Sequence, residues 1–417
     1  MDVLLEKMFT EEERWTEAVE IGVGKDISKA EMRKLCNPEI RKAFLYRVAT
    51  NQYRIAPPHM ALIPKDTPGE FRTVYVNENI DRIFLSLVNN LFFEMFADMI
   101  HPACKSYQKG IGCGKIVQEV SREVQKGDGI VGYVSDLSKY FDSVKIEYID
   151  AIFDEIERRV GKSTVINIVR EYYHTDLCFD TEGNLIQHYQ SLKQGCAVAS
   201  FLADVMLYDM DKKLSQMKGK YVRYSDDCLY IGHDYEKAMQ IMKQILAEKE
   251  LTLNPKKVKY IDGQHYFKFL GFAIRGDQLA LSKNRVRTFQ KEIEKRTIKG
   301  KHTYKQAVNA VNYFLYGGEY SWASSILPII NVEEDIDELN EFVMDALRAV
   351  QTGRKKIGGL GYVPDGHVGV IVRGIGRNVA ANRKKTEKKL EGYMSIRTMR
   401  NAYMSSHEAY EALVRMM

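Results

Sequence analysis

Hydrophobic and polar positions recur with different periods along the chain, and these periods predict where helices and strands lie. Residues 1–55 are charged and carry the spacing of helices. Four prolines between 57 and 68 then bracket short extended runs, which predicts a hairpin. A long apolar-rich stretch from Ile80 to Met99 predicts a helix after that hairpin.

From residue 130 the pattern is that of a split βαβ sheet. IVGYVSD is a predicted strand that ends in Asp136, and apolar residues recur at helical spacing over 146–160. A second helix is expected at about 197–214, followed by a hairpin around RYSDDCLYIG, a further helix and a strand near Val258. Strand, helices, hairpin, helix and strand is the order of a ferredoxin-like sheet.

Two adjacent carboxylates, Asp226 and Asp227, lie at the tip of the predicted hairpin. A surface turn is one interpretation, although turn formation does not require both residues. In a split βαβ sheet the first strand neighbours the hairpin, so Asp136 is expected close to them. Three carboxylates at one sheet edge repel one another unless a cation offsets their charge. Oxygen ligands favour Mg²⁺ or Mn²⁺ over zinc, and two such ions about 4 Å apart suit phosphoryl transfer.

The composition is that of a soluble globular protein, with 45% hydrophobic and 28% charged residues. No apolar run is long enough for a membrane span, and the N-terminus lacks the layout of a signal peptide. The six cysteines contain no CxxC pair, which favours reduced thiols over a zinc knuckle. We therefore expect a cytoplasmic protein that does not enter membranes.

The formal net charge of +5 is small, but the positive charge is concentrated beyond about residue 282, where the chain is predicted to be helical. Residues 283–305 hold nine Lys or Arg against two acids, and residues 373–389 hold seven against one. Such clusters suit phosphate contacts, although a solvated helical face is the alternative. The candidate nucleic-acid-binding residues are Lys283, Arg285, Arg287, Lys295 and Arg296.

Several motifs, in order across about 60–275, resemble those of reverse transcriptases. YSDD resembles the YxDD box, and DLSKYFDS the motif that holds the first catalytic aspartate of that family. LKQGCAVASFLADVMLYDMD, LTLNPKKVKY and FKFLGFAI resemble the glutamine-glycine motif, the motif after it and the primer-grip hairpin. IPKDTPGEFRTVYVNENIDR and SYQKGIG resemble segments upstream of these. The chain is most similar to prokaryotic enzymes of the group II intron and retron type.

The resemblance implies an α+β right-hand polymerase with fingers, a ferredoxin-like palm and an α-helical thumb with a C-terminal extension. Its predicted parts are an N-terminal helical segment (1–55), fingers with part of the palm (56–129), a palm with the YSDD site (130–281), and a basic helical thumb with an RNA-binding extension (282–417). The implied enzyme is an RNA-directed DNA polymerase, a nucleotidyltransferase that uses two Mg²⁺ ions, with Mn²⁺ as an alternative.

The same resemblance implies roles for the residues that match the catalytic motifs. Asp136 and Asp226 would ligate both ions, with Asp227 beside them and with the backbone carbonyl of Leu137 as a further ligand. Lys257 matches the lysine proposed to protonate the departing pyrophosphate.

Five further residues would bind the incoming deoxynucleotide. Lys65 and Arg72 match fingers positions that clamp the triphosphate. Phe141 would exclude a 2′-hydroxyl, and a core phenylalanine is the alternative. Gln194 and Gly195 would support the templating base and the nucleotide, since glycine allows close backbone approach.

Ala199 and Ser200 stand where the usual prokaryotic pattern has Ser-Pro, as in the abortive-infection and defence-associated branches. We therefore expect cDNA synthesis on a dedicated noncoding RNA in antiphage defence. A retron-type enzyme and a template-independent DNA polymerase remain alternatives within this class. A non-catalytic RNA-binding scaffold is the alternative from another class. An RNA polymerase is disfavoured because Phe141 would exclude the 2′-hydroxyl of a ribonucleotide. The sequence leaves open the primer, which could be RNA or a protein hydroxyl, and the oligomeric state.

Overall fold

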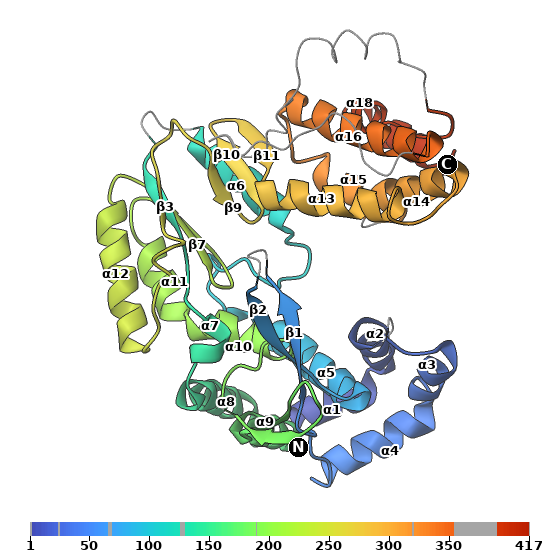
Figure 1. Cartoon of the computed structure of the whole chain (residues 1–417). Coiled ribbons are helices and arrows are strands. Elements are labelled where there is room, and N and C mark those ends of the chain that lie inside the picture. The colour runs from blue at the N-terminus through green and yellow to red at the C-terminus, as the bar shows by residue number, and fades with distance from the viewer. Residues whose placement is uncertain are drawn as a thin grey trace. The chain divides into compact units, whose positions relative to one another are not determined.

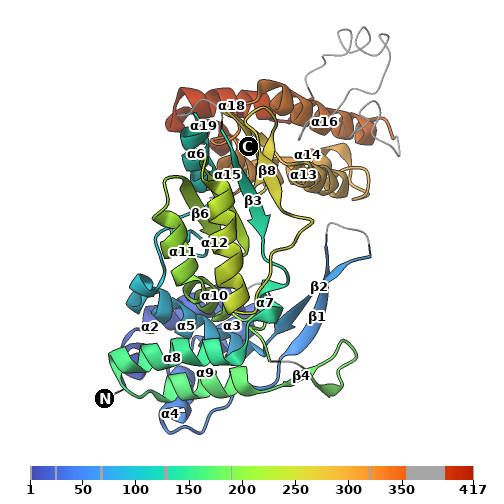
Figure 2. The same cartoon turned by 90° about the vertical axis from the view of Figure 1, so that its left-hand side faces the viewer.

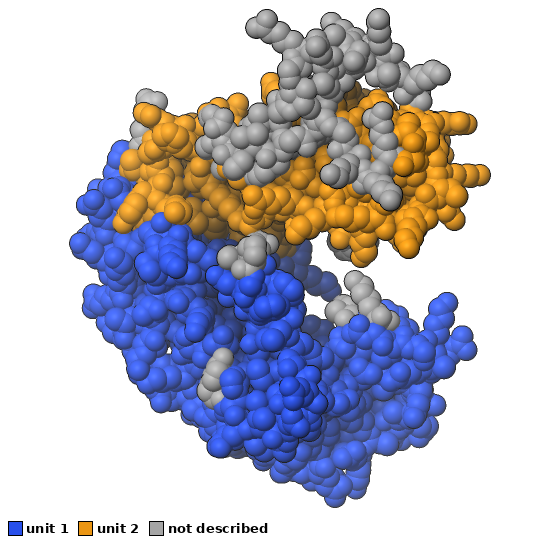
Figure 3. Space-filling model, viewed as in Figure 1, with its two compact units in different colours: residues 1–110, 135–258 blue, residues 111–134, 259–417 orange. Residues whose placement is uncertain are grey.

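The computed structural model describes residues 2–23, 26–65, 69–125, 130–188, 190–318, 321–353 and 390–416. The chain divides into two compact units, shown in Figure 3: residues 1–110 with 135–258, and residues 111–134 with 259–417. The glycine-rich stretch and the second basic cluster of the sequence, at 358–376 and 373–389, lie outside the described residues. The domain bounds expected from the sequence stay a prediction.

The first unit begins with four helices, as the helical spacing of residues 1–55 predicted (Figure 1). Trp15, Phe44 and Phe84 form its aromatic core, in which Phe44 lies 5.5 Å from Trp15 and 6.0 Å from Phe84 between ring centroids. The side chains of Asp2, Ser28 and Asn37 accept hydrogen bonds from main-chain N–H groups and so begin three of the helices. The helices are α1 (Val3–Thr10), α2 (Glu12–Gly22), α3 (Lys29–Leu35) and α4 (Pro38–Ala49).

The predicted hairpin follows as β1 (His59–Pro64) and β2 (Phe71–Val76), which pair in antiparallel register with Ile63 opposite Arg72. Helix α5 (Asn79–Met95) confirms the helix expected after it. A second hairpin, which the sequence analysis did not predict, extends the sheet in the order β2-β1-β4-β5. Its strands are β4 (Leu177–Phe179) and β5 (Leu185–Gln187).

The strands of the ferredoxin-like sheet lie in the spatial order β6-β7-β3-β8. Strands β6 (Lys220–Tyr224) and β7 (Asp227–Ile231) form the hairpin predicted around RYSDDCLYIG. Strand β3 (Gly132–Asp136) is fully buried, including its polar residues Ser135 and Asp136, and it lies beside β7. The strand expected near Val258 is β8 (Lys259–Ile261).

Helices pack on this sheet and on one another within the first unit. Helix α12 contacts β7, α11 contacts β6, and the two helices lie side by side in Figure 2. The helix expected at about 197–214 is broken at Leu207. Arg223 donates to the main-chain carbonyl of Asp204, which a continuous helix would offer to the N–H of Tyr208. The helices are α7 (Tyr140–Ser143), α8 (Ile146–Val160), α9 (Thr164–His174), α10 (Ala199–Met206), α11 (Tyr208–Ser215) and α12 (Tyr235–Glu248).

The second unit contains a small antiparallel sheet in the order β11-β10-β9 and a group of helices. Its strands are β9 (Phe267–Phe269), β10 (Phe272–Arg275) and β11 (Gln278–Leu281). Helix α16 packs against α13, α14 and α18, and the ring centroids of the buried Phe289 and the half-buried Trp322 lie 4.7 Å apart. The helices are α6 (Cys113–Val124), α13 (Lys283–Arg296), α14 (Tyr304–Tyr316), α15 (Trp322–Ile326), α16 (Glu333–Gln351), α18 (Ile396–Ser405) and α19 (His407–Arg415).

Candidate active site

The fold brings Asp136 and Asp226 together, although 90 positions separate them in the sequence. Asp136 is the last residue of β3, and Asp226 is the second residue of the two-residue turn between β6 and β7. The N–H of Leu137 donates to the carbonyl of Asp226 over 3.1 Å, so the main chain at the end of β3 is tied to the turn. Asp227 begins β7 opposite Tyr224. The expectation that the first strand neighbours the hairpin is confirmed.

The charges of the two aspartates act on each other. Burial and the negative charge of Asp136 raise the pKa of Asp226, and the positive charges of Lys257 and Arg72 partly oppose that rise. Lys257 donates from its ammonium Nζ to Asp136 Oδ2 over 2.6 Å. Repulsion between the two carboxylates raises the proton affinity of Asp226. A bound cation offsets the same repulsion, so the pair forms a site that favours a cation.

The donor set fits a hard divalent cation in its chemistry, since Asp136 and Asp226 offer only oxygen atoms. Among the described residues, no group of three His, Cys, Asp or Glu side chains is arranged to hold a metal ion. The fit therefore rests on two carboxylates, with Lys257 in place on one of them.

The loop that carries Lys257 is fixed to the end of β3. The N–H of Asn254 donates to the main-chain carbonyl of Asp136 over 2.8 Å, and the N–H of Lys257 donates to the carbonyl of Asn254. The Lys257 side chain is 58% exposed, whereas that of Asp136 is 10% exposed. Its ammonium group therefore reaches the carboxylate from the solvent side.

The two cations of the β1-β2 hairpin have different surroundings. Arg72 is exposed, and its positive charge is among those that oppose the rise in the pKa of Asp226. Lys65 lies at the end of the hairpin, where its N–H donates to the carbonyl of Glu70 and its ammonium lies 3.9 Å from the Glu70 carboxylate. Arg72 therefore acts on Asp226 through its charge, whereas Lys65 is paired with Glu70 within the hairpin.

Gln194 and Gly195 pass directly against strand β2. The N–H of Tyr75 donates to the carbonyl of Gln194 over 2.7 Å. Gly195 has a φ of +104°, and a Cβ atom added there would lie 2.7 Å from the carbonyl oxygen of Tyr75. Glycine is required at this position both for its backbone conformation and for the close approach.

Phe141 lies in the short helix α7, five positions beyond Asp136. It is half-buried, its ring centroid lies 5.7 Å from that of Tyr140, and its carbonyl accepts from the N–H of Leu192. Tyr140 is fully buried and donates to the carbonyl of Ala203. Tyr140 therefore serves the core, whereas Phe141 remains partly accessible.

The basic residues expected to bind nucleic acid fall into two groups on α13. Arg287 and Lys295 are exposed. Arg285 lies over the ring of Phe272 at 4.3 Å, and Arg296 lies over the ring of Phe314 at 4.3 Å while pairing with Glu292. Lys283 is half-buried.

The sequence analysis missed two groups of residues that the structure sets apart. Lys291 continues the exposed row of Arg287 and Lys295 at four-residue intervals, a spacing that was visible in the sequence, whereas Lys299 lies beyond the end of α13 and pairs with Glu294. Arg223 is fully buried within strand β6, directly before the YSDD turn. A charged residue inside an otherwise apolar strand was the signal for it.

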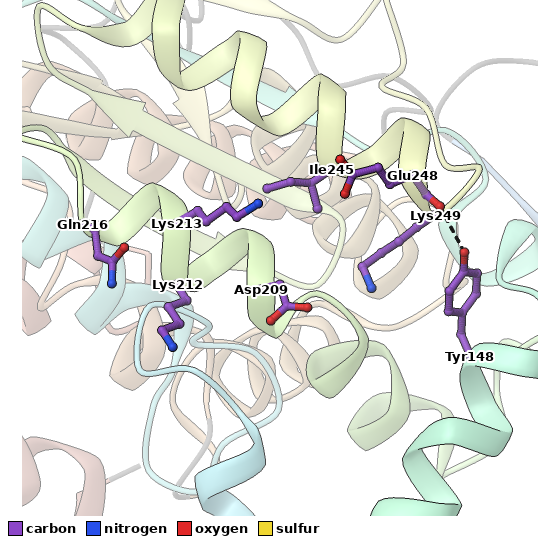
Figure 4. A pocket seen from close by; sticks show the side chains of 8 residues that line it. All are labelled: Tyr148, Asp209, Lys212, Lys213, Gln216, Ile245, Glu248 and Lys249. Atoms are coloured by element: carbon purple, nitrogen blue, oxygen red, sulfur yellow. Dashed lines mark hydrogen bonds between the residues drawn. The ribbon is translucent and has the colours of Figure 1, made fainter.

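A cavity of about 540 Å³ opens between α11, the end of α12 and the start of α8 (Figure 4). The hydroxyl of Tyr148 donates to the carbonyl of Glu248 at its edge. The residues predicted from the sequence to form the active site do not line it. Its lining residues are Tyr148, Asp209, Lys212, Lys213, Gln216, Ile245, Glu248 and Lys249.

The sequence model of the family described as reverse transcriptase (RNA-dependent DNA polymerase) matches residues 63–274, which is half of the chain. The chain belongs to the reverse transcriptase family. The match begins at the end of β1 and ends within β10, and it includes β2, the carboxylate pair, Gln194-Gly195 and Lys257. The mixed α+β polymerase fold expected from the sequence is thereby confirmed.

Solved structures similar to this member of the reverse transcriptase family include three structures of telomerase from two Candida species. Apo telomerase from Candida tropicalis is 13% identical over 72% of this chain, with a TM-score of 0.45, and a form truncated from its C-terminal domain is 15% identical over 57%, with a TM-score of 0.44. Telomerase from Candida albicans in complex with a TWJ fragment of telomeric RNA is 11% identical over 76%, with a TM-score of 0.43. This chain spans 58% of the length of each.

A search of curated proteins gives no significant match. Within the described part of the chain, no helix combines the length and the apolar character that crossing a membrane requires.

Proposed function

We propose that this member of the reverse transcriptase family is an RNA-directed DNA polymerase with its active site at Asp136 and Asp226. The observation that carries the proposal is the main-chain bond from Leu137 to Asp226, which holds two mutually repelling carboxylates together within the family match. Non-catalytic use of the fold would give no reason to keep such a pair, because its repulsion opposes folding.

The carboxylates of Asp136 and Asp226 would hold Mg²⁺ or Mn²⁺, with Asp227 and the carbonyl of Leu137 beside them. Bound ions of this kind stabilise charge on the attacking and leaving oxygens in phosphoryl transfer. Arg72, whose charge acts on Asp226, would bind the triphosphate of the deoxynucleotide, which Lys65 would join after leaving Glu70. Lys257 would leave Asp136 and donate its proton to the departing pyrophosphate.

The half-buried ring of Phe141 would lie under the sugar of the nucleotide and exclude a 2′-hydroxyl. Gln194 and Gly195, fixed to β2 through Tyr75, would position the nucleotide and the templating base. The exposed row on α13 would bind the phosphates of the template and the cDNA. Helical residues four apart rise about 6 Å, which suits contacts to successive phosphates of one strand.

We infer a dedicated noncoding RNA as the template and antiphage defence in the cytoplasm as the setting. Support for this part comes from the resemblance to the defence-associated branches at Ala199 and Ser200. Ser200 donates to the carbonyl of Ala197 and lies 3.1 Å from Asn89, so in this chain it supports the start of α10.

Nucleotide incorporation by the purified protein with its copurifying RNA tests the proposal. Labelled dNTPs and NTPs are supplied with Mg²⁺, and a double variant Asp226→Ala, Asp227→Ala serves as the control. We expect DNA product from the wild type and none from the double variant. Sequencing of the product identifies the template and the priming site, and an untemplated product would replace the RNA-directed activity with a template-independent one. Tight RNA binding without any incorporation would favour the scaffold.

Replacement of Phe141 tests the sugar preference separately. Phe141→Ala removes the ring and should raise ribonucleotide incorporation, whereas Tyr140→Phe alters the neighbouring core ring and should leave the dNTP to NTP ratio unchanged. Equal discrimination by wild type and Phe141→Ala would remove Phe141 from the proposed site.

A further inference from the structure

Beneath the YSDD turn lies a buried polar cluster that the proposed chemistry does not use. Arg223 is fully buried and forms a two-pronged ion pair with Asp211, from Nε over 2.8 Å and from Nη2 over 2.7 Å. Asp204 is also fully buried, and its Oδ1 accepts from the hydroxyl of Ser106. Burial raises the pKa of Asp204 to about 6. Such a cluster is costly to bury unless its groups satisfy one another.

The cluster is directed at Ser225, the residue before Asp226. The N–H of Ser225 donates to the Ser106 hydroxyl over 3.0 Å, and its carbonyl accepts from Arg223 Nη1 over 3.1 Å. Its own hydroxyl accepts from Tyr107 over 3.2 Å. All three polar groups of Ser225 are therefore held by residues outside the turn.

Ser225 needs this support because of its backbone conformation. Its φ is +55°, in the left-handed region that costs a residue with a Cβ atom about 1–2 kcal/mol. Glycine is the usual residue where the first position of a two-residue hairpin turn has positive φ and the second does not. The hydrogen bonds to Ser225 stabilise a conformation that the residue would not adopt alone.

The supporting residues reach the turn because a neighbouring segment pairs with β6. The N–H of Arg223 donates to the carbonyl of Ala103, and the N–H of Lys105 donates to the carbonyl of Arg223, each over 2.9 Å. This pairing places Ser106 and Tyr107, from the SYQKGIG motif, directly beneath the turn.

We propose that Ser106, Tyr107 and Arg223 are positioning residues, which fix Asp226 for catalysis by holding Ser225 in the left-handed conformation. The catalytic part rests on the proposed function. The segment that contains SYQKGIG thus acts on the active site through hydrogen bonds to the turn and not through contact with a substrate.

Ser106→Ala is the first test, since it removes the acceptor of the Ser225 N–H with a small change in volume. We expect kcat to fall about tenfold, with KM for dNTP and RNA affinity unchanged. Glycine tolerates positive φ, so adding Ser225→Gly should restore most of the lost kcat. Arg223 is a poor target because its loss would leave Asp211 uncompensated in the core.

Tyr53→Phe is the matched control, because it also removes a buried hydroxyl that donates to a buried carboxylate, here Asp81 in the same unit. It should lower Tm without changing kcat at temperatures well below Tm. If Ser106→Ala fails to fold, Tyr107→Phe serves in its place, since Tyr107 is 44% exposed. A smaller loss of kcat in the same direction is expected from it.

The dissociation constant for Mn²⁺, measured from the EPR signal of the free ion, gives a second readout that requires no polymerisation. We expect Ser106→Ala to weaken Mn²⁺ binding several-fold and Ser225→Gly to restore it. An inactive wild type with these metal-binding shifts would refute the proposed function and leave the positioning role supported. Unchanged kcat and unchanged Mn²⁺ affinity in both Ser106→Ala and Tyr107→Phe would overturn the positioning role, as would a loss that Ser225→Gly fails to restore.

Discussion

Gly195→Ala perturbs the contact between the glutamine-glycine turn and strand β2. Two effects act there. The φ of +104° lies in the region that favours glycine, and a residue with a Cβ atom in this region costs about 1–2 kcal/mol. The new Cβ would also lie 2.7 Å from the Tyr75 carbonyl oxygen and 3.2 Å from its nitrogen. Both are main-chain atoms that cannot rotate away.

The second effect adds to the first, since the backbone must move by several tenths of an ångström to accept a methyl group. Overpacking of this kind costs about 1–3 kcal/mol. We therefore expect Gly195→Ala to lower the free energy of unfolding by about 2–5 kcal/mol. The shift of β2 would also displace Arg72, so kcat/KM for dNTP should fall at temperatures where the protein stays folded.

Gly161→Ala separates the two effects. Gly161 ends α8 with a φ of +87°, and a Cβ atom there would meet nothing within 4 Å. Its φ of +87° and ψ of 176° lie in a region almost exclusive to glycine, so Gly161→Ala should show only a conformational cost of about 1–3 kcal/mol and leave kcat/KM unchanged. Urea denaturation followed by circular dichroism measures both variants. Equal destabilisation by Gly195→Ala and Gly161→Ala would refute the close contact.

Three further predictions concern the two units. Lys257→Met should lower kcat about a hundredfold, because the proton donor is lost. Lys256→Met, which changes the exposed neighbour, should leave kcat unchanged. Equal kcat values for the two variants would show that Lys257 is not the proton donor. Replacing Arg287, Lys291 and Lys295 by Gln should reduce the slope of log RNA affinity against log salt concentration by about one phosphate contact for each residue. The same change at the cavity residues Lys212, Lys213 and Lys249 should leave that slope unchanged. Equal slopes for the two triple variants would refute RNA binding by the α13 surface. Burial and the negative charges of Glu338 and Glu334 raise the pKa of Asp335 to about 7. Protonation of Asp335 therefore stabilises the folded state fully below about pH 4, and this contribution is lost as the pH rises through 7. Asp335→Asn should then be more stable than wild type at pH 8, on the order of 3 kcal/mol, but not at pH 4, as urea denaturation would show; equal stability at pH 8 would refute the raised pKa.

Local sequence patterns predicted the elements that carry the active site. The strand that ends in Asp136 and the hairpin at Asp226 are each visible as short apolar-rich runs, and the order of elements then placed them side by side. The convergence of the two carboxylates was therefore predictable without knowledge of any side-chain contact.

Elements set by long-range contacts were not predictable in this way. Strands β4 and β5 have three residues each, and β4 joins β1 through a single pair, His59 with Phe179. Such short strands leave almost no periodic signal. The break between α10 and α11 has the same origin, because Arg223 takes the carbonyl of Asp204 from another part of the chain.

Side-chain partners explain why the basic residues of α13 were predicted only in part. A count of charges treats Arg285 and Arg287 alike. In a helix, however, residues two positions apart lie on different faces. Arg285 packs on Phe272 and Arg287 is exposed. The count identified a basic helix, and the helical period was needed to identify its exposed row.

Hydrogen bonds to the turn keep the two repelling carboxylates together before a cation binds. Like charges at Asp136 and Asp226 favour separation, which a flexible turn would permit. Here the Leu137 N–H holds the carbonyl of Asp226, while Ser106, Tyr107 and Arg223 hold Ser225. Glycine at 225 would reach the same φ without strain and would need less support, whereas serine depends on these hydrogen bonds to keep the left-handed conformation. A serine held by three bonds therefore favours one orientation of Asp226 over conformational freedom, as a preorganised metal site requires.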